Sequence, residues 1–161
     1  MTSSPLRLRA VDTIDLAVIA AHLQDAVVQL GDIAYQPGQR RFALMFNRFM
    51  WEDVQDDAGP GAKADKSAPY RRVRSALHFD GVLKVKSQGL RLDRKDAVAE
   101  MLTLAFAPEG EVAGAITMTF AGGGAIKLEV ECLDAWLSDV TQPWPTPNLP
   151  RHGTDADEPL G

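Results

Sequence analysis

The feature that most restricts the fold of this chain is a change in hydrophobic period after Gly31. Ahead of that glycine, apolar residues recur every three or four positions over 13–27, which predicts an amphipathic helix. Asp12 stands just before this segment and is a favoured residue type for a helix N-cap. Beyond Gly31, apolar and polar residues alternate, which is the period of half-buried strands. The pattern therefore predicts a mainly antiparallel sheet with a helix near its N-terminal end.

One strand is predicted ahead of this helix and seven after it, over 6–11, 33–35, 41–51, 72–79, 83–86, 102–106, 116–120 and 126–132. Both sides of 41–51 are apolar, so this strand should be central. A second helix is predicted at the end of the fold, because Leu133, Trp136, Leu137 and Val140 recur at helical spacing. The predicted class is α+β, a mainly antiparallel sheet or roll with one N-terminal and one C-terminal helix. Its strand count is that of a pleckstrin-homology-like roll, an analogy of fold that implies no function.

The 161 residues fit one domain, large enough to fold without a disulfide or a metal. We expect a disordered N-terminus over 1–5 and a single domain over 6–141. Within that domain, 54–69 has no apolar period and reads as a flexible loop. Prolines recur through 142–161, which predicts a loose tail.

Charge is distributed unevenly along the chain. The net charge is −5, yet 70–95 contains eight basic residues and two acidic ones, so this segment is +6 and the remainder −11. A local basic surface on an acidic protein can attract an anionic partner. The isoelectric point of 5.1 and the lack of aromatic residues among the basic ones argue against nucleic acid as that partner.

The two strands of the basic segment are predicted to form a hairpin at Asp80-Gly81, a frequent hairpin dipeptide. A two-residue loop would mix apolar and charged residues on each face, so a three-residue loop or a bulge is preferred. That register pairs Phe79 with Leu83 and Leu77 with Val85. It puts the following residues on one exposed basic face: Arg72, Arg74, His78, Lys84 and Lys86.

This basic face is the candidate binding site. Guanidinium groups suit bidentate contacts with phosphate, with a carboxylate ligand or with an acidic segment of a partner. Arg41, Arg48 and Arg91 could extend the face. The competing interpretation is a solvated sheet surface whose lysines discourage pairing between edges.

Sequence motifs for catalysis, metals and cofactors are absent. Cys132 is the one cysteine, so no intramolecular disulfide or zinc-binding cysteine cluster can form, and a reducing cytoplasmic setting fits best. Cys132 continues an apolar phase and is predicted to be buried. The three histidines lie far apart and follow no metal-binding spacing. No signal peptide and no membrane-spanning apolar run is predicted.

Four segments together resemble a bacterial family of unknown function, seen mainly in alphaproteobacteria. They are LRLRAVDTIDLAVIAAHLQDAVV, RRFALMFNRFMWE, LHFDGVLKVKSQGLRL and FAGGGAIKLEVECLDAWLSDV. The resemblance spans nearly all of 6–140 and implies no activity, substrate, cofactor or catalytic residue.

The sequence as a whole favours a small cytoplasmic binding or accessory protein without catalysis. Its basic face would bind an anionic ligand or an acidic protein segment, and an open sheet edge could support a homodimer. The alternative is a small enzyme whose polar residues converge only in three dimensions. An enclosed pocket with convergent polar groups would favour the enzyme, and an open basic face would favour the binding protein.

Overall fold

In the computed structural model the described residues are 5–56 and 70–147, with only the backbone described for 55 and 56. The elements in chain order are β1 Arg7–Ala10, α1 Thr13–His22, β2 Val27–Gln36, a 3₁₀ helix Pro37–Gln39, β3 Arg41–Phe49, α2 Trp51–Asp56, β4 Tyr70–Phe79, β5 Val82–Gln88, β6 Val98–Pro108, β7 Gly114–Phe120, β8 Ala125–Val130, β9 Ala135–Asp139 and β10 Trp144–Thr146. The expected class is thus confirmed in its coarse form, a mostly antiparallel sheet with two helices.

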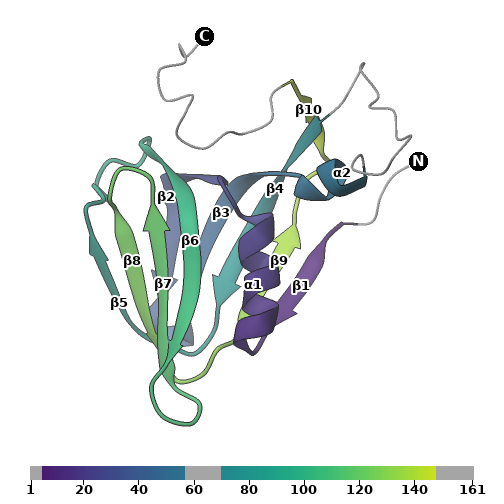
Figure 1. Ribbon diagram of the computed structural model, residues 1–161. Helices are drawn as coiled ribbons and strands as arrows, with labels where there is room; N and C mark the ends of the chain where they lie inside the picture. Colours follow the sequence, from purple (N-terminus) through teal and green to yellow (C-terminus); the bar gives the residue numbers. More distant parts are fainter. Residues whose placement is uncertain (1–4, 57–69, 148–161) are drawn as a thin grey trace.

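The strands follow one path in the order β1-β9-β4-β3-β2-β6-β7-β8-β5, and β10 pairs with β4. The path bends between β2 and β6, so that two layers face each other (Figure 1). We call β1, β9, β4, β3 and β2 the first layer, and β6, β7, β8 and β5 the second. A break in the β2–β3 register between Val28 and Ile33 lies at this bend. Val27–Gln29 pair with β6, and β2 pairs with β3 on both sides of the break.

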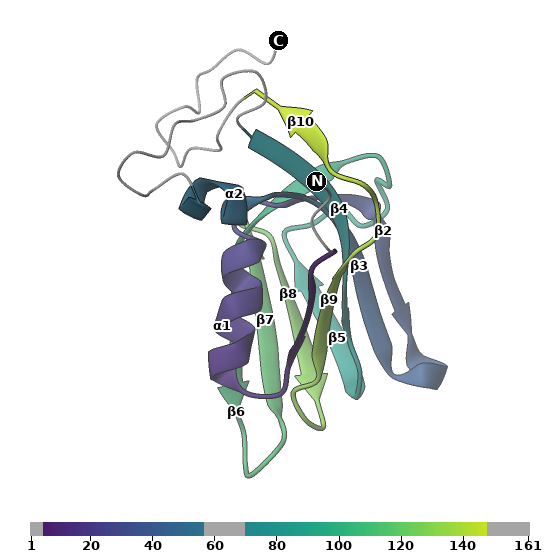
Figure 2. The ribbon, with the colours of Figure 1, turned by 90° about the vertical axis from the view of Figure 1, so that its right-hand side faces the viewer.

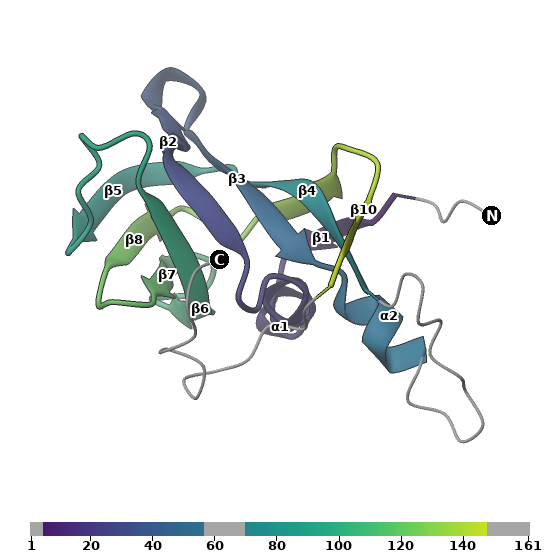
Figure 3. The ribbon, with the colours of Figure 1, turned by 90° about the horizontal axis from the view of Figure 1, so that it is seen from above.

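Helix α1 packs against β1 and β6 (Figure 3). Its N-cap is Asp12, as predicted, and the Asp12 side chain accepts a hydrogen bond of 2.8 Å from the N–H of Asp15. The buried side chains of Leu16 and Ile19 face the core. The helix ends at His22, earlier than the expected residue 27, because Asp25 has a left-handed φ of 62° and β2 begins two residues later.

The core lies between the layers, where every second side chain of a strand points inward. On β3, Phe42, Leu44 and Phe46 are buried, and their neighbours point outward. This strand lies between β4 and β2, so the prediction of a central strand is confirmed. The outer surface of the first layer is covered by neither helix (Figures 2 and 3).

The predicted C-terminal helix is wrong, since its residues form strand β9. Ala135 and Leu137 are fully buried and Trp136 points the other way, which is the period of a strand. The strand pairs with β1 on one side and β4 on the other. Helical spacing and strand spacing both fit so short an apolar segment, and pairing with two neighbours decides between them. The pleckstrin-homology analogy relied on that helix and is not confirmed.

The predicted hairpin at Asp80-Gly81 is also wrong. Strand β4 pairs with β3, β9 and β10, whereas β5 pairs with β8 in the other layer. Gly81 takes a left-handed φ of 74°, and the N–H of Val82 bonds to the carbonyl of Arg40 at 2.8 Å. The dipeptide therefore makes a corner that takes the chain from the first layer to the second.

The predicted loop, the predicted tail and the N-terminus are described only in part. The expected flexible loop over 54–69 begins inside α2, and its remainder lies outside the described residues. The tail expected over 142–161 contains β10, whose Pro145 lies opposite Arg71 on a strand at the sheet margin, where proline is tolerated. Residues 148–161 and 1–4 lie outside the described part of the chain.

Candidate anion-binding face

The outer surface of the first layer gathers arginines from β1, β4 and β3. Inward residues of β1, β9, β4 and β3 alternate with outward ones, as strand geometry requires. We call this surface the arginine face and define it by its outward residues Arg7, Arg9, Arg41, Arg74, His78 and Trp136. Arg7 and Arg9 are exposed, and the other four are partly buried. The register of these strands aligns the six side chains on one surface.

The centre of the arginine face is a row of stacked side chains. Trp136 on β9 lies directly opposite Arg9 on β1 and His78 on β4. The Arg9 guanidinium carbon is 4.6 Å from the centre of the indole ring, within cation–π range. The His78 ring is stacked nearly parallel to the indole, at an angle of 12° and 6.0 Å between ring centres. Since β9 lies between the other two strands, Arg9 and His78 occupy opposite faces of the indole.

Three of the four arginines are paired with an aspartate. Arg9 bonds to Asp134 at 3.1 Å and Arg41 to Asp80 at 2.8 Å. Arg74 bonds to Asp32 at 2.9 Å.

Arg7 differs from these three. It is exposed, and within the described part of the chain no carboxylate pairs with it. Arg7 lies opposite Ser138 and two residues from Arg9 on the same face of β1. The positive charge of the arginine face that no described carboxylate neutralises therefore lies on β1.

His78 contributes little positive charge near neutral pH. Burial lowers its pKa below the ordinary value of 6.5, and the nearby Arg41 guanidinium lowers it further. Asp80, whose carboxylate lies 3.7 Å from the imidazole, acts in the opposite direction without cancelling the decrease. The neutral imidazole acts mainly as a packing surface for Trp136.

The five residues predicted as one basic face are divided between the two layers. Arg74 and His78 lie on the arginine face, and Arg72 lies farther along the same side of β4. Arg72 lies over the ring of Phe49 at 5.9 Å, and burial lowers its pKa. Lys84 and Lys86 are on β5 in the second layer, where Lys86 pairs with Glu129 at 3.2 Å. The division follows from the corner at Asp80-Gly81.

The three arginines considered as extensions have different locations. Arg41 belongs to the arginine face, and Arg91 is exposed and paired with Asp93 at 3.3 Å. Arg48 is fully buried on the core side of β3, where it bonds to Asp139 and Glu52. Burial opposes its charge, but these hydrogen bonds outweigh burial and raise the pKa of Arg48. It is thus a structural cation.

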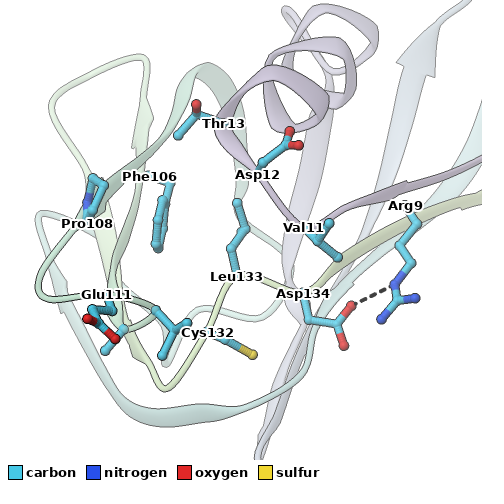
Figure 4. Close-up of a pocket in the computed structure, with 12 residues that line it drawn as sticks. Arg9, Val11, Asp12, Thr13, Phe106, Pro108, Glu111, Cys132, Leu133 and Asp134 are labelled. Atoms are coloured by element: carbon cyan, nitrogen blue, oxygen red, sulfur yellow. Dashed lines mark hydrogen bonds and ion pairs between the residues drawn. The ribbon is translucent and has the colours of Figure 1, made fainter.

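An open cleft of about 460 Å³ lies beside the arginine face at the end of the two layers (Figure 4). The β1–α1 turn, the β6–β7 loop and the β8–β9 turn form its walls. Phe106 and Leu133 supply apolar surface, and the Arg9–Asp134 pair lies at its margin. Asp12 and Glu111 also line the cleft, so its acidic residues outnumber its one arginine.

Cys132 is exposed and lines this cleft, so the prediction of burial is wrong. Strand β8 ends at Val130, and the chain turns before Cys132 can continue the inward phase. No histidine is among the cleft's lining residues in the described part of the chain, so they provide the thiol with no imidazole base. The described residues also contain no cluster of three or more histidine, cysteine, aspartate or glutamate side chains suited to a metal ion. None of the described helices is long and apolar enough to cross a membrane.

Comparison with protein families gives one match. A model of the family described as "Protein of unknown function (DUF2948)" matches residues 6–152. The chain belongs to this family. The resemblance noted from the sequence is therefore confirmed, and the match includes every residue of the arginine face. No curated protein matches the chain, and no solved structure matches it.

Arg7 and Arg9, the most exposed part of this face, were not singled out from the sequence. Arg7 and Arg9 alternate with Leu6, Leu8 and Ala10 in the predicted first strand, and that alternation already places both arginines on one side. They lie outside the basic segment, so the charge count did not include them. Trp136 was missed because its segment was assigned to a helix.

Proposed function

We propose that this protein is a non-catalytic binding or accessory protein of the cytoplasm, and that its arginine face binds an acidic segment of a partner protein. The observation that carries the proposal is Arg7, an exposed cation without a described carboxylate partner, beside the exposed Arg9. Arginine forms bidentate hydrogen bonds with carboxylates, so two arginines on one strand suit side chains of glutamate or aspartate. The single cysteine, exposed as a free thiol, supports a reducing compartment.

Single-stranded nucleic acid is a poorer fit as the ligand. Bases bind such proteins by stacking on exposed aromatic faces. Arg9 and His78 already cover both faces of Trp136.

A small anion is also a poorer fit than a protein segment. Small-molecule sites are usually concave and enclose most of the ligand. The arginine face is instead an open sheet surface, and the adjoining cleft is lined by more carboxylates than cations. An extended acidic chain can contact Arg7 and Arg9 together without enclosure.

Binding of a fluorescent peptide of alternating glutamate and threonine tests this proposal. Fluorescence anisotropy would compare the wild type with the Arg7→Glu/Arg9→Glu variant. The matched control is Lys84→Glu/Lys86→Glu, which makes the same change in net charge on the second layer. We expect the first variant to raise Kd about tenfold or more, equivalent to about 1.4 kcal/mol, and the control to change it by less than about threefold. Binding should also weaken as salt screens the charges.

Equal effects of the two variants would contradict the proposal, because they would show a response to net charge alone. Wild-type protein that binds no acidic peptide at low salt would contradict it as well. Circular dichroism of both variants establishes that the fold is retained.

A further inference from the structure

We propose that the acidic segment binds by adding a strand to the free edge of β1, a proposal that rests on the function proposed above. Strand β1 is one end of the strand path, and among the described residues only β9 pairs with it. It is the outermost strand of the first layer in Figure 1. An extended segment can join such an edge through main-chain hydrogen bonds, while its side chains provide selectivity.

The register shows which main-chain groups are available. The N–H of Asp139 bonds to the carbonyl of Leu6 at 3.0 Å. Antiparallel strands alternate between hydrogen-bonded and non-hydrogen-bonded pairs. Leu8 and Ala10 therefore direct their main-chain groups toward β9, whereas Arg7 and Arg9 direct theirs toward the open edge.

Arg7 and Arg9, whose main-chain groups face the open edge, also have exposed basic side chains. An added strand would place every second side chain on the side of the arginine face, at the two-residue spacing of Arg7 and Arg9. Acidic side chains there would lie opposite or diagonal to these arginines, which is a favourable cross-strand arrangement. The edge thus selects an extended segment with carboxylates at alternate positions.

A second copy of this chain is not the expected occupant. Two β1 strands paired antiparallel about Leu8 would put Arg7 of each copy opposite Arg9 of the other. Directly opposed like charges destabilise a strand pair, and charged side chains on an edge discourage self-association. The same arginines that oppose self-pairing attract an acidic strand.

The other end of the path, β5, is less suited to strand addition. Its pairing with β8 is interrupted by a register shift between Val82 and Lys84, a feature that discourages pairing at edges. Lys86 is already paired with Glu129. Strand β1 has a regular register and carries Arg7, which pairs with no carboxylate among the described residues.

Amide hydrogen exchange of the wild-type protein tests strand addition directly. The probe is the alternating glutamate–threonine peptide, and its control is the same peptide with the amides of its glutamates N-methylated. The control keeps the charge but lacks the main-chain donors that would face β1 in an antiparallel pair. We expect the first peptide to slow exchange at the amides of Arg7 and Arg9 about tenfold or more, with little change at Leu8. The N-methylated peptide should bind more weakly and leave these amides unprotected.

A pair of variants isolates the main-chain donor from the side chain. Arg7→Ala removes the guanidinium only, whereas Arg7→Pro also removes an N–H that faces the open edge. Proline is tolerated at such an edge position, because no bond to β9 is lost. We expect Arg7→Pro to weaken binding of the threonine peptide at least threefold more than Arg7→Ala.

The results separate the two proposals. Loss of binding in Arg7→Glu/Arg9→Glu together with unprotected amides at Arg7 and Arg9 would overturn strand addition and leave the arginine face as the binding surface. Equal affinity for the unmodified and N-methylated peptides would overturn strand addition in the same way. Absence of any binding to acidic peptides would overturn both.

Discussion

Arg48 and Asp139 form a bidentate ion pair that joins β3 to β9 across the intervening strand β4. The Arg48 Nε and Nη2 atoms lie 3.1 Å from the two Asp139 carboxylate oxygens. Ser75 of β4 also donates to Asp139 at 2.6 Å, and the N–H of Leu6 donates to the same carboxylate at 3.0 Å. Glu52 of α2 bonds to the other side of the guanidinium at 2.9 Å. This cluster ties together the strands that carry the arginine face.

Replacing Arg48 should destabilise the fold strongly. Its side chain is 0% exposed and that of Asp139 is 6% exposed, so Arg48→Met leaves a buried carboxylate without its partner. We expect a loss of about 3–5 kcal/mol in the free energy of unfolding, measured by urea denaturation. Arg9→Met is the matched control, because the Arg9 side chain is 53% exposed and losing its ion pair should cost no more than about 1 kcal/mol. Similar losses in both variants would show that the buried cluster has no special role.

The same cluster should make stability depend on acidic pH. Burial would raise the pKa of Asp139, but hydrogen bonds from Arg48, Ser75 and Leu6 outweigh it and lower the pKa below the ordinary 3.8. The pKa of Glu52 is likewise lowered from 4.5, since bonds from Arg48 outweigh its burial.

A carboxyl whose pKa is lower in the folded state stabilises that state above its unfolded pKa. We therefore expect the free energy of unfolding to fall as pH decreases below about 4.5 and to keep falling through the folded pKa values. Urea denaturation between pH 7 and pH 3 measures this. In Arg48→Met the decrease should be smaller, so the two curves approach each other in acid. Parallel curves would contradict the assigned cause of the pKa shifts.

The sequence predicted the local elements more reliably than their partners. Alternation located β3, β4, β6, β7 and β8, and the residue type of Asp12 located the start of α1. Alternation cannot tell which strand lies beside which, so Asp80-Gly81 was assigned to a hairpin although β4 and β5 belong to different layers. The candidate face was divided for the same reason, since half of it depended on that pairing.

The charge along the chain revealed a basic segment but not the aspartates that neutralise it, such as Asp53 at 2.9 Å from Arg71. Nor could it show that Arg48, on the inward side of a strand, would be a buried cation. These contacts join residues far apart in sequence, and they form only when the strand order is established.

Disulfide cross-linking tests the strand order. Lys86 lies opposite Lys127 on β8, whereas the three-residue hairpin would place it opposite Ala76 on β4. In a Cys132→Ser background, Lys86→Cys/Lys127→Cys should form a disulfide on mild oxidation, because opposed antiparallel residues have Cα atoms about 4.5–5.5 Å apart. Lys86→Cys/Ala76→Cys shares one cysteine and should not. Efficient cross-linking of the second pair would contradict the described topology.

Gly114 should not tolerate a side chain. A Cβ at this position would lie 2.5 Å from the carbonyl oxygen of Ala107 and 2.6 Å from the ring of Phe106, which lines the cleft. We expect Gly114→Ala to reduce the free energy of unfolding by about 1–3 kcal/mol in thermal or urea denaturation. At Gly38 a Cβ would meet nothing within 4 Å, so Gly38→Ala should change stability by no more than about 0.5 kcal/mol. Equal stability of the two variants would contradict the close contact of Gly114 with Ala107 and Phe106.

The most direct test of the binding account is a nuclear magnetic resonance titration. Nitrogen-15-labelled protein would be titrated with the alternating glutamate–threonine peptide, and the Trp136 indole signal assigned from Trp136→Phe. Binding at the arginine face and the edge of β1 should cause the largest chemical-shift changes at the amides of Arg7 and Arg9 and at the Trp136 indole, with small changes at Lys84 and Lys86. Changes centred on Lys84 and Lys86, or no changes at saturating peptide, would contradict it.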